Sequence, residues 1–298
     1  MRVIVPVAVT DATLVSASIP EDDHAAWNAG TTYAAQDRVI VPSVHAIFES
    51  AVDSNTGNDP LDDDGTKWVM VSATNRWRAF DKQIAVPAAA ATDVTYTLES
   101  SKLVNGLTVH GVVGSTITLT VSNGVQSTVF TRSLVNRIST NGWHSFLFGG
   151  FERQSDVVFL DLPWYGPGST YTVTVTAQDG VAEIGQIVFG RLIRIGGTRW
   201  EPEISIVSGS VRERDVYLNF ILVKRATALR AQYRVVAQRN SVASIVKIMR
   251  DLETEPAVWI GDSDPKYGLI IYGLPFDYSH TVTRPNFTEY SLIVEGLK

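Results

Sequence analysis

The residue types that could do chemistry begin with an acidic run at residues 53–65, DSNTGNDPLDDDG. Asp and Asn oxygens at alternate positions are the kind of ligand that Ca²⁺ takes from proteins, so the candidate ligands are Asp53, Asn55 and Asp59. The run departs from the EF-hand loop, because glycine stands one position early and no glutamate closes it. We expect a solvated turn here, with a calcium site as the alternative.

The sequence lacks the familiar catalytic motifs. It has no cysteine, which excludes a thiol nucleophile and a Cys-type zinc site. It contains no G-x-S-x-G elbow, no H-E-x-x-H helix and no phosphate-binding loop, and its five histidines are scattered. A glycosidase needs two facing carboxylates, which the 31 acidic residues could supply only through folding. We therefore expect no catalytic residue, no cofactor and no enzyme, with a polysaccharide-cleaving enzyme as a distant alternative.

Aromatic residues beside turn signals are further candidates for ligand contact. Trp143 follows Asn141-Gly142, and Trp164-Tyr165 stands directly before Gly166-Pro167-Gly168. Exposed rings on loops often mark a contact with sugar or protein. Trp143, Trp164 and Tyr165 are therefore candidate glycan contacts, and the alternative is a place in the core or in a subunit contact.

Strands must position these loops. Residues 116–121 (TITLTV), 157–162 (VVFLDL) and 171–176 (YTVTVT) are β-branched and largely alternating, which is typical of half-buried strands. Turn signals such as Asn123-Gly124 separate them at short intervals. The pattern predicts a mainly β fold with a central jelly-roll-like β-sandwich over residues 82–198.

One segment near the C-terminus has helical periodicity. Apolar residues recur at spacings of three and four in Ser241–Glu253, which predicts one amphipathic helix that Asn240 or Ser241 can cap. The expected stripe consists of Val242, Ile245, Val246, Met249 and Leu252. A composition break near Gly196-Gly197 precedes this region. We expect a C-terminal α+β domain over residues 199–298.

A small aromatic-rich module is expected at residues 24–81, behind an N-terminal arm at residues 1–23. Its aromatic and apolar residues are spaced as a three-stranded unit requires: Trp27, Tyr33, Val39, Phe48 and Trp68. Their order resembles the carbohydrate-binding modules of the family 5/12 type. Ala51 and Val52 stand where chitin-binding members carry exposed rings. We therefore expect the aromatics to form a core, and glycan stacking is the alternative.

The string ATNRWRAFD at residues 73–81 follows this module. In that position it resembles a signature of tailed-bacteriophage virion proteins from tails, baseplates and appendages. Arg76 and Arg78 flank Trp77, so a cation–π contact or a pairing with Asp81 could fix how the module docks onto the sandwich. We expect this interdomain role for Arg76, Trp77, Arg78 and Asp81.

Residues 223–298 resemble the C-terminal domain of phage tail-associated proteins that carry the same string. The match is carried by VKRA, VWIG, YG and a terminal EGL, and it implies a structural or assembly role. The basic residues Lys224, Arg225, Arg230 and Arg234 gather in this region of a net-acidic chain. Such an asymmetry favours an oriented contact with an acidic neighbour, so these four are the expected assembly residues.

The charge balance narrows the classes of partner. With 25 basic and 31 acidic residues the net charge is −6, which disfavours nucleic-acid binding. No apolar run reaches the roughly 18 residues of a membrane span. The resemblance implies a structural virion component of a tail, baseplate or neck appendage. Its partners would be other virion proteins and further copies of itself, as a homo-oligomer. The alternative is an adhesin that binds host-surface glycan through its aromatic loops.

Overall fold

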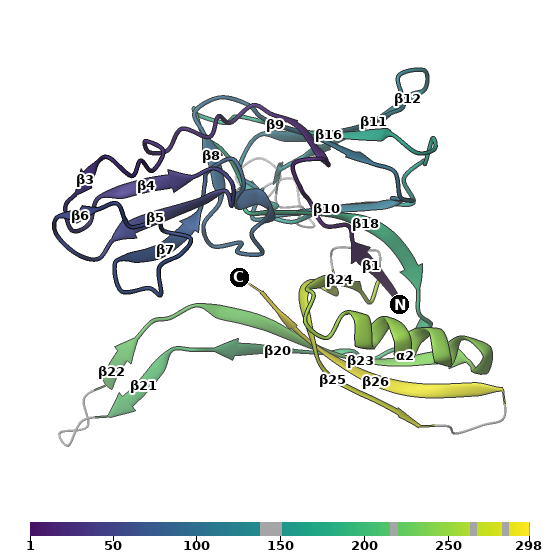
Figure 1. Cartoon of the computed structure of the whole chain (residues 1–298). Helices are drawn as coiled ribbons and strands as arrows, with labels where there is room; N and C mark the ends of the chain where they lie inside the picture. Colours follow the sequence, from purple (N-terminus) through teal and green to yellow (C-terminus); the bar gives the residue numbers. More distant parts are fainter. Residues whose placement is uncertain (138–150, 215–219, 263–266, 282–285, 298) are drawn as a thin grey trace.

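The structure is a computed structural model that describes residues 1–137, 151–214, 220–262, 267–281 and 286–297 (Figure 1). Strands make up 52% of the described residues and helical residues 6%. The expected mainly β class is confirmed, and the described residues contain one α-helix. None of the helices in these described ranges is long and apolar enough to cross a membrane.

A ten-stranded antiparallel sheet runs through the molecule. Its order is β15 (Val157–Leu160), β10 (Gly106–His110), β18 (Gln186–Arg194), β1 (Arg2–Pro6), β24 (Ala257–Ile260), β25 (Ile270–Thr281), β26 (Phe287–Gly296), β23 (Thr227–Gln238) and β19 (Gly197–Thr198), and β20 (Glu203–Ser208) also pairs with β23. Strand β1 lies between β18 and β24. Residues expected to form part of an N-terminal arm therefore join the sandwich to the C-terminal region.

A second sheet covers one end of this long sheet. Its order is β12 (Ser127–Ser133), β11 (Thr116–Ser122), β16 (Ser169–Thr176), β9 (Val94–Ser100) and β2 (Leu14–Ala17). The expected alternation is seen in β11, where Ile117, Leu119 and Val121 point into the core that also contains Leu107 and Phe189 of the long sheet. Threonines occupy the outer positions and pair across strands, as Thr97 and Thr172 do. The two layers form a β-sandwich.

The same face of the long sheet is covered at its other end by helix α2 (Val242–Asp251). Ile245 and Met249 are buried there against Val3 and Trp259. The expected stripe is thus only partly buried, because Val242 and Val246 remain half-exposed. Ser241 does not cap the helix with its side chain, since its hydroxyl donates to the Gln238 carbonyl at 2.7 Å.

The N-terminal module contains the expected three-stranded sheet, β4 (Arg38–Val41), β5 (Ala46–Ser50) and β7 (Trp68–Ala73). Short strands β3 (Thr32–Tyr33) and β6 (Asn55–Thr56) pair beside it. Tyr33, Phe48 and Trp68 are buried together in its core. The remaining short elements among the described residues are β8 (Ala88–Ala90), which pairs with β17 (Ala182–Ile184), the pair β13 (Val135–Arg137) and β14 (Phe151–Arg153), and the 3₁₀ turns η1 (Arg78–Phe80) and η2 (Arg239–Ser241).

A long ribbon leaves the body on the side of the N-terminal module (Figure 1). We name it the β-arm; it consists of β20, β21 (Val211–Arg214), β22 (Phe220–Val223) and the first residues of β23, Thr227–Arg230. The pairs Ile206–Leu229 and Ile204–Ala231 lie on one face. Ala231 is buried in the core beneath α2. The apolar side chains on this face of the β-arm therefore lie on the same side of β23 as the core, but beyond the end of the core.

Candidate assembly interface

A row of rings connects the N-terminal module to the sandwich. The Trp77 ring stacks on His45 of the module, with centroids 4.0 Å apart and planes 18° apart. Phe80 meets Trp77 edge-on at 6.0 Å and meets Tyr96 of β9 at 5.4 Å. Trp77 is buried and belongs to the sandwich core. Trp77 therefore lies at the junction between the module and the sandwich.

The neighbours of Trp77 differ from those expected. The Arg76 carbonyl accepts the Tyr96 hydroxyl at 3.0 Å, and Arg78 Nε donates to the Ala73 carbonyl at 3.4 Å. Asp81 Oδ1 accepts the Gln83 N–H at 2.8 Å, and burial raises the pKa of Asp81. Within the described ranges, neither arginine stacks on Trp77; the aromatic partners of its ring are His45 and Phe80. Arg76, Arg78 and Asp81 therefore hold the backbone of the junction, while the ring that stacks on Trp77 is the imidazole of His45.

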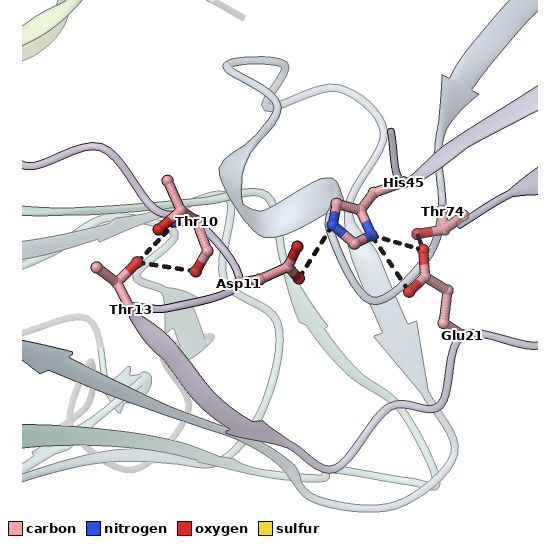
Figure 2. A network of polar contacts seen from close by, with 6 residues as sticks. All are labelled: Thr10, Asp11, Thr13, Glu21, His45 and Thr74. Atoms are coloured by element: carbon pink, nitrogen blue, oxygen red, sulfur yellow. Dashed lines mark hydrogen bonds and ion pairs between the residues drawn. The ribbon is translucent and has the colours of Figure 1, made fainter. Parts of the chain in front are cut away.

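A polar network surrounds His45 (Figure 2). Its Nδ1 lies 3.1 Å from Glu21 Oε1, and its Nε2 lies 3.2 Å from Asp11 Oδ1. Thr74 Oγ1 donates to the same Glu21 oxygen at 2.9 Å. Asp11 is presented by a turn in which the Thr10 N–H donates to Thr13 Oγ1 at 2.7 Å. These contacts fasten the segment between β1 and the module to the module, and β2 within the same segment pairs with β9 of the sandwich.

We expect Trp77→Ala to loosen this junction, because truncating a buried tryptophan leaves a cavity between His45 and Phe80. The cost in unfolding free energy should be about 3–4 kcal/mol. Urea unfolding followed by circular dichroism would measure it, with Trp164→Ala, at a 43% exposed residue, as the control. Equal stability of Trp77→Ala and wild type would show that the ring does not hold the two parts together.

A buried histidine forms a second polar cluster, at the end of β10. His110 Nδ1 lies 2.8 Å from Asp156 Oδ1, and Nε2 lies 3.1 Å from Thr108 Oγ1. The order carboxylate, imidazole, hydroxyl has the form of a catalytic triad. Thr108, however, is fully buried within the sheet, so its hydroxyl cannot reach an external substrate. The ring stacks on Tyr272 at 5.3 Å, so the cluster fixes the contact between β10 and β25.

The acid of this pair predicts a pH dependence. Burial opposes the ionisation of Asp156, but the hydrogen bond and charge of His110 outweigh it, so the pKa of Asp156 lies below 3.8. A lowered pKa means that the ionised form stabilises the fold above the unfolded-state value, and that this contribution is lost as the pH falls through the folded-state value.

Asp156→Asn should therefore cost about 1 kcal/mol at neutral pH, a small value because solvent reaches more than half of the side chain. The difference from wild type should shrink below about pH 4. Thermal unfolding across this pH range, with the exposed Asp62→Asn as control, would measure it. A difference that stays constant with pH would contradict the pairing.

The calcium candidates do not converge in the structure. Asp53 Oδ1 accepts the Ala35 N–H at 3.0 Å, Asn55 Oδ1 accepts from Asn58, and Asp59 Oδ1 caps the Leu61 N–H. Among the described residues, no group of three His, Cys, Asp or Glu side chains is arranged to hold a metal ion. The N–H groups of Trp68, Lys67 and Gly65 lower the pKa of Asp63. The side-chain oxygens of this run thus serve to build its turns.

The two candidate glycan contacts that the structure describes, Trp164 and Tyr165, do not form a platform of exposed rings. Trp164 is 43% exposed. Tyr165 is half-buried against the sandwich core, and its hydroxyl hydrogen-bonds Thr128 of β12. Trp143 lies outside the described residues. Only one ring of the described pair therefore faces solvent.

Of the four expected assembly residues, Lys224, Arg225 and Arg230 lie in the β-arm, and Arg234 lies in the body. Lys224 and Arg225 are exposed, between β22 and β23 of the β-arm. Arg230 is paired with Glu295 at 2.6 Å and stacks on the ring of Phe276. Arg234 is exposed further along β23, within the body. Lys224 and Arg225 are therefore the pair that the β-arm carries outward.

Sequence reasoning missed the apolar character of the β-arm. Phe220 and Leu222 are 70% and 68% exposed, and Ile206 is exposed on the adjoining strand pair. Their alternation with polar residues is the ordinary pattern of a strand that packs on a core, so only the observed exposure reveals them. An exposed apolar strip bordered by basic residues is typical of a protein-contact surface.

Comparison with known protein families, curated proteins and solved structures finds no match to the chain.

Proposed function

We propose that this protein is a structural component of a tailed-phage virion, in the tail, baseplate or a neck appendage, and that it docks through its β-arm. The proposal begins from the resemblance of residues 73–81 and 223–298 to virion proteins. The observation that carries it furthest is the β-arm, which projects from the body with apolar and basic side chains exposed. Exposed apolar strips of this kind mark contact surfaces, which an assembly protein can bury against a neighbour.

The rest of the molecule supports a scaffolding role. Strand β1 links the sandwich to the C-terminal region through pairings on both of its edges, and the ring row at Trp77 fixes the N-terminal module. A body braced in this way keeps the β-arm in a defined direction. The adhesin alternative has less support among the described candidates, because Trp164 is exposed and Tyr165 is half-buried.

The test is the presence of the protein in purified particles of the phage that encodes it. Immunoblotting of density-purified virions, with immunogold labelling to find the position, should detect the protein at a fixed number of copies per particle. Its recovery only from the lysate, with none in purified particles, would overturn the proposal. Cleavage of host polysaccharide by the purified protein would favour the enzyme class instead.

A further inference from the structure

The outer part of the β-arm, strands β21 and β22, is here named the tip. One face of the tip is not covered by the rest of the described chain. Strands β21 and β22 pair only with each other among the described residues, and a two-stranded ribbon is marginally stable in water by itself. Phe220 and Leu222 lie on the same face of β22 and are largely exposed. The guanidinium of Arg214 lies 4.5 Å from the centroid of the Phe220 ring. This face combines apolar area with positive charge.

The β-arm as a whole is basic. Residues 203–230 contain five Lys and Arg against three Asp and Glu, although the whole chain has a net charge of −6. Lys224 and Arg225 lie next to β22 and are exposed. A surface that binds the tip should therefore be acidic, with apolar side chains at its centre.

The N-terminal module carries a surface of that kind. Strand β7 is the edge of its three-stranded sheet, and Val69, Met70 and Val71 along it are exposed, Met70 to 61%. The loop that leads into β7 contains Leu61, also exposed, and the acids Asp59, Asp62, Asp63 and Asp64. Residues 24–81 together hold eight acidic and four basic residues. An exposed apolar edge strand of this kind is a template for pairing with another chain.

We propose that the tip of the β-arm of one copy docks on the β7 edge and the acidic loop of a second copy. Both surfaces stay exposed within one chain, so the chain's own fold satisfies neither. Because the two surfaces differ, the contact is head-to-tail, and repeating it produces a closed ring or an open filament. The inference deepens the proposed function, on which it rests for the role of the β-arm.

The test uses two double variants that each disable one half of the contact. Phe220→Asp with Leu222→Asp removes the apolar contact of the tip and leaves the β7 edge unchanged. Val69→Asp with Val71→Asp removes the apolar contact of the β7 edge and leaves the tip unchanged. A matched control, Val125→Asp with Val129→Asp, places two acids at exposed valines on and beside β12. Circular dichroism checks that each variant folds, and sedimentation velocity measures the assembly state.

Wild type and control should self-associate, and raising the ionic strength should weaken the association. Each double variant alone should associate at least about tenfold more weakly. Mixing the two variants should give a dimer and nothing larger, because one intact tip then meets one intact β7 edge.

Three results would overturn the interface. One is a wild type that stays monomeric; another is a module variant that still assembles through paired β-arms. The third is a mixture that forms no dimer. Each of these leaves the proposed function standing if the wild-type protein is found in purified particles, so the two failures can be told apart.

Discussion

The Gly190→Ala variant is expected to lose about 3 kcal/mol of unfolding free energy, a large fraction of the stability of an ordinary domain. Gly190 lies on β18 opposite Pro6 of β1. A Cβ at this position would stand 1.9 Å from the Val5 carbonyl oxygen, so the backbone of β1 would have to move away from β18. Because β1 joins β18 to β24, the shift would weaken the link between the two halves of the long sheet.

The control for this variant is Gly197→Ala, in the short strand β19. There the nearest atom to an added Cβ is the Val236 carbonyl oxygen at 4.0 Å, an ordinary contact. Gly197→Ala should unfold at nearly the wild-type urea concentration, whereas Gly190→Ala should unfold at a clearly lower one. Equal urea midpoints of unfolding for the two variants would contradict the close packing of β1 against β18 at Gly190.

Local sequence patterns predict a good part of this fold. The alternation at residues 116–121 yields β11, the stripe containing Ile245 and Met249 yields α2, and the spacing of Tyr33, Phe48 and Trp68 yields the module core. In each case the element is short, and the spacing of apolar residues within it predicts which side chains are buried.

Pairings between distant segments could not be predicted in the same way. Nothing near Arg2–Pro6 indicates that this strand pairs with residues 190–194 and 258–260. His110 and Asp156 are 46 positions apart, and only the pairing of β10 with β15 brings them together. Side-chain periodicity reports which face of a strand is buried but not which strand lies beside it.

The central position of β1 also affects how the assembly role is tested. Removing residues 1–81 would take β1 out of the long sheet, and removing residues 199–298 would take away its partner β24. Either deletion would leave an unpaired edge in the remaining fragment, so loss of assembly would not identify the docking surface. Substitutions at the exposed tip of the β-arm avoid this problem.

The second large effect, loss of the docking contact, is expected from substitutions at the tip of the β-arm. Phe220→Asp with Leu222→Asp places two acids on a face that carries Arg214 and lies beside Lys224 and Arg225. Both side chains are exposed, so the fold should keep its stability to within about 0.5 kcal/mol. The docking contact should nevertheless be lost, since the apolar centre of an interface supplies most of its binding energy.

The most direct measurement is therefore the number of copies of this folded variant in purified particles, with the gene supplied in trans to a phage that lacks its own copy. The Val125→Asp, Val129→Asp control should be incorporated as wild type is, and the tip variant should be absent from the particles although it accumulates in the lysate. Incorporation of the tip variant at the wild-type copy number would contradict docking through the β-arm.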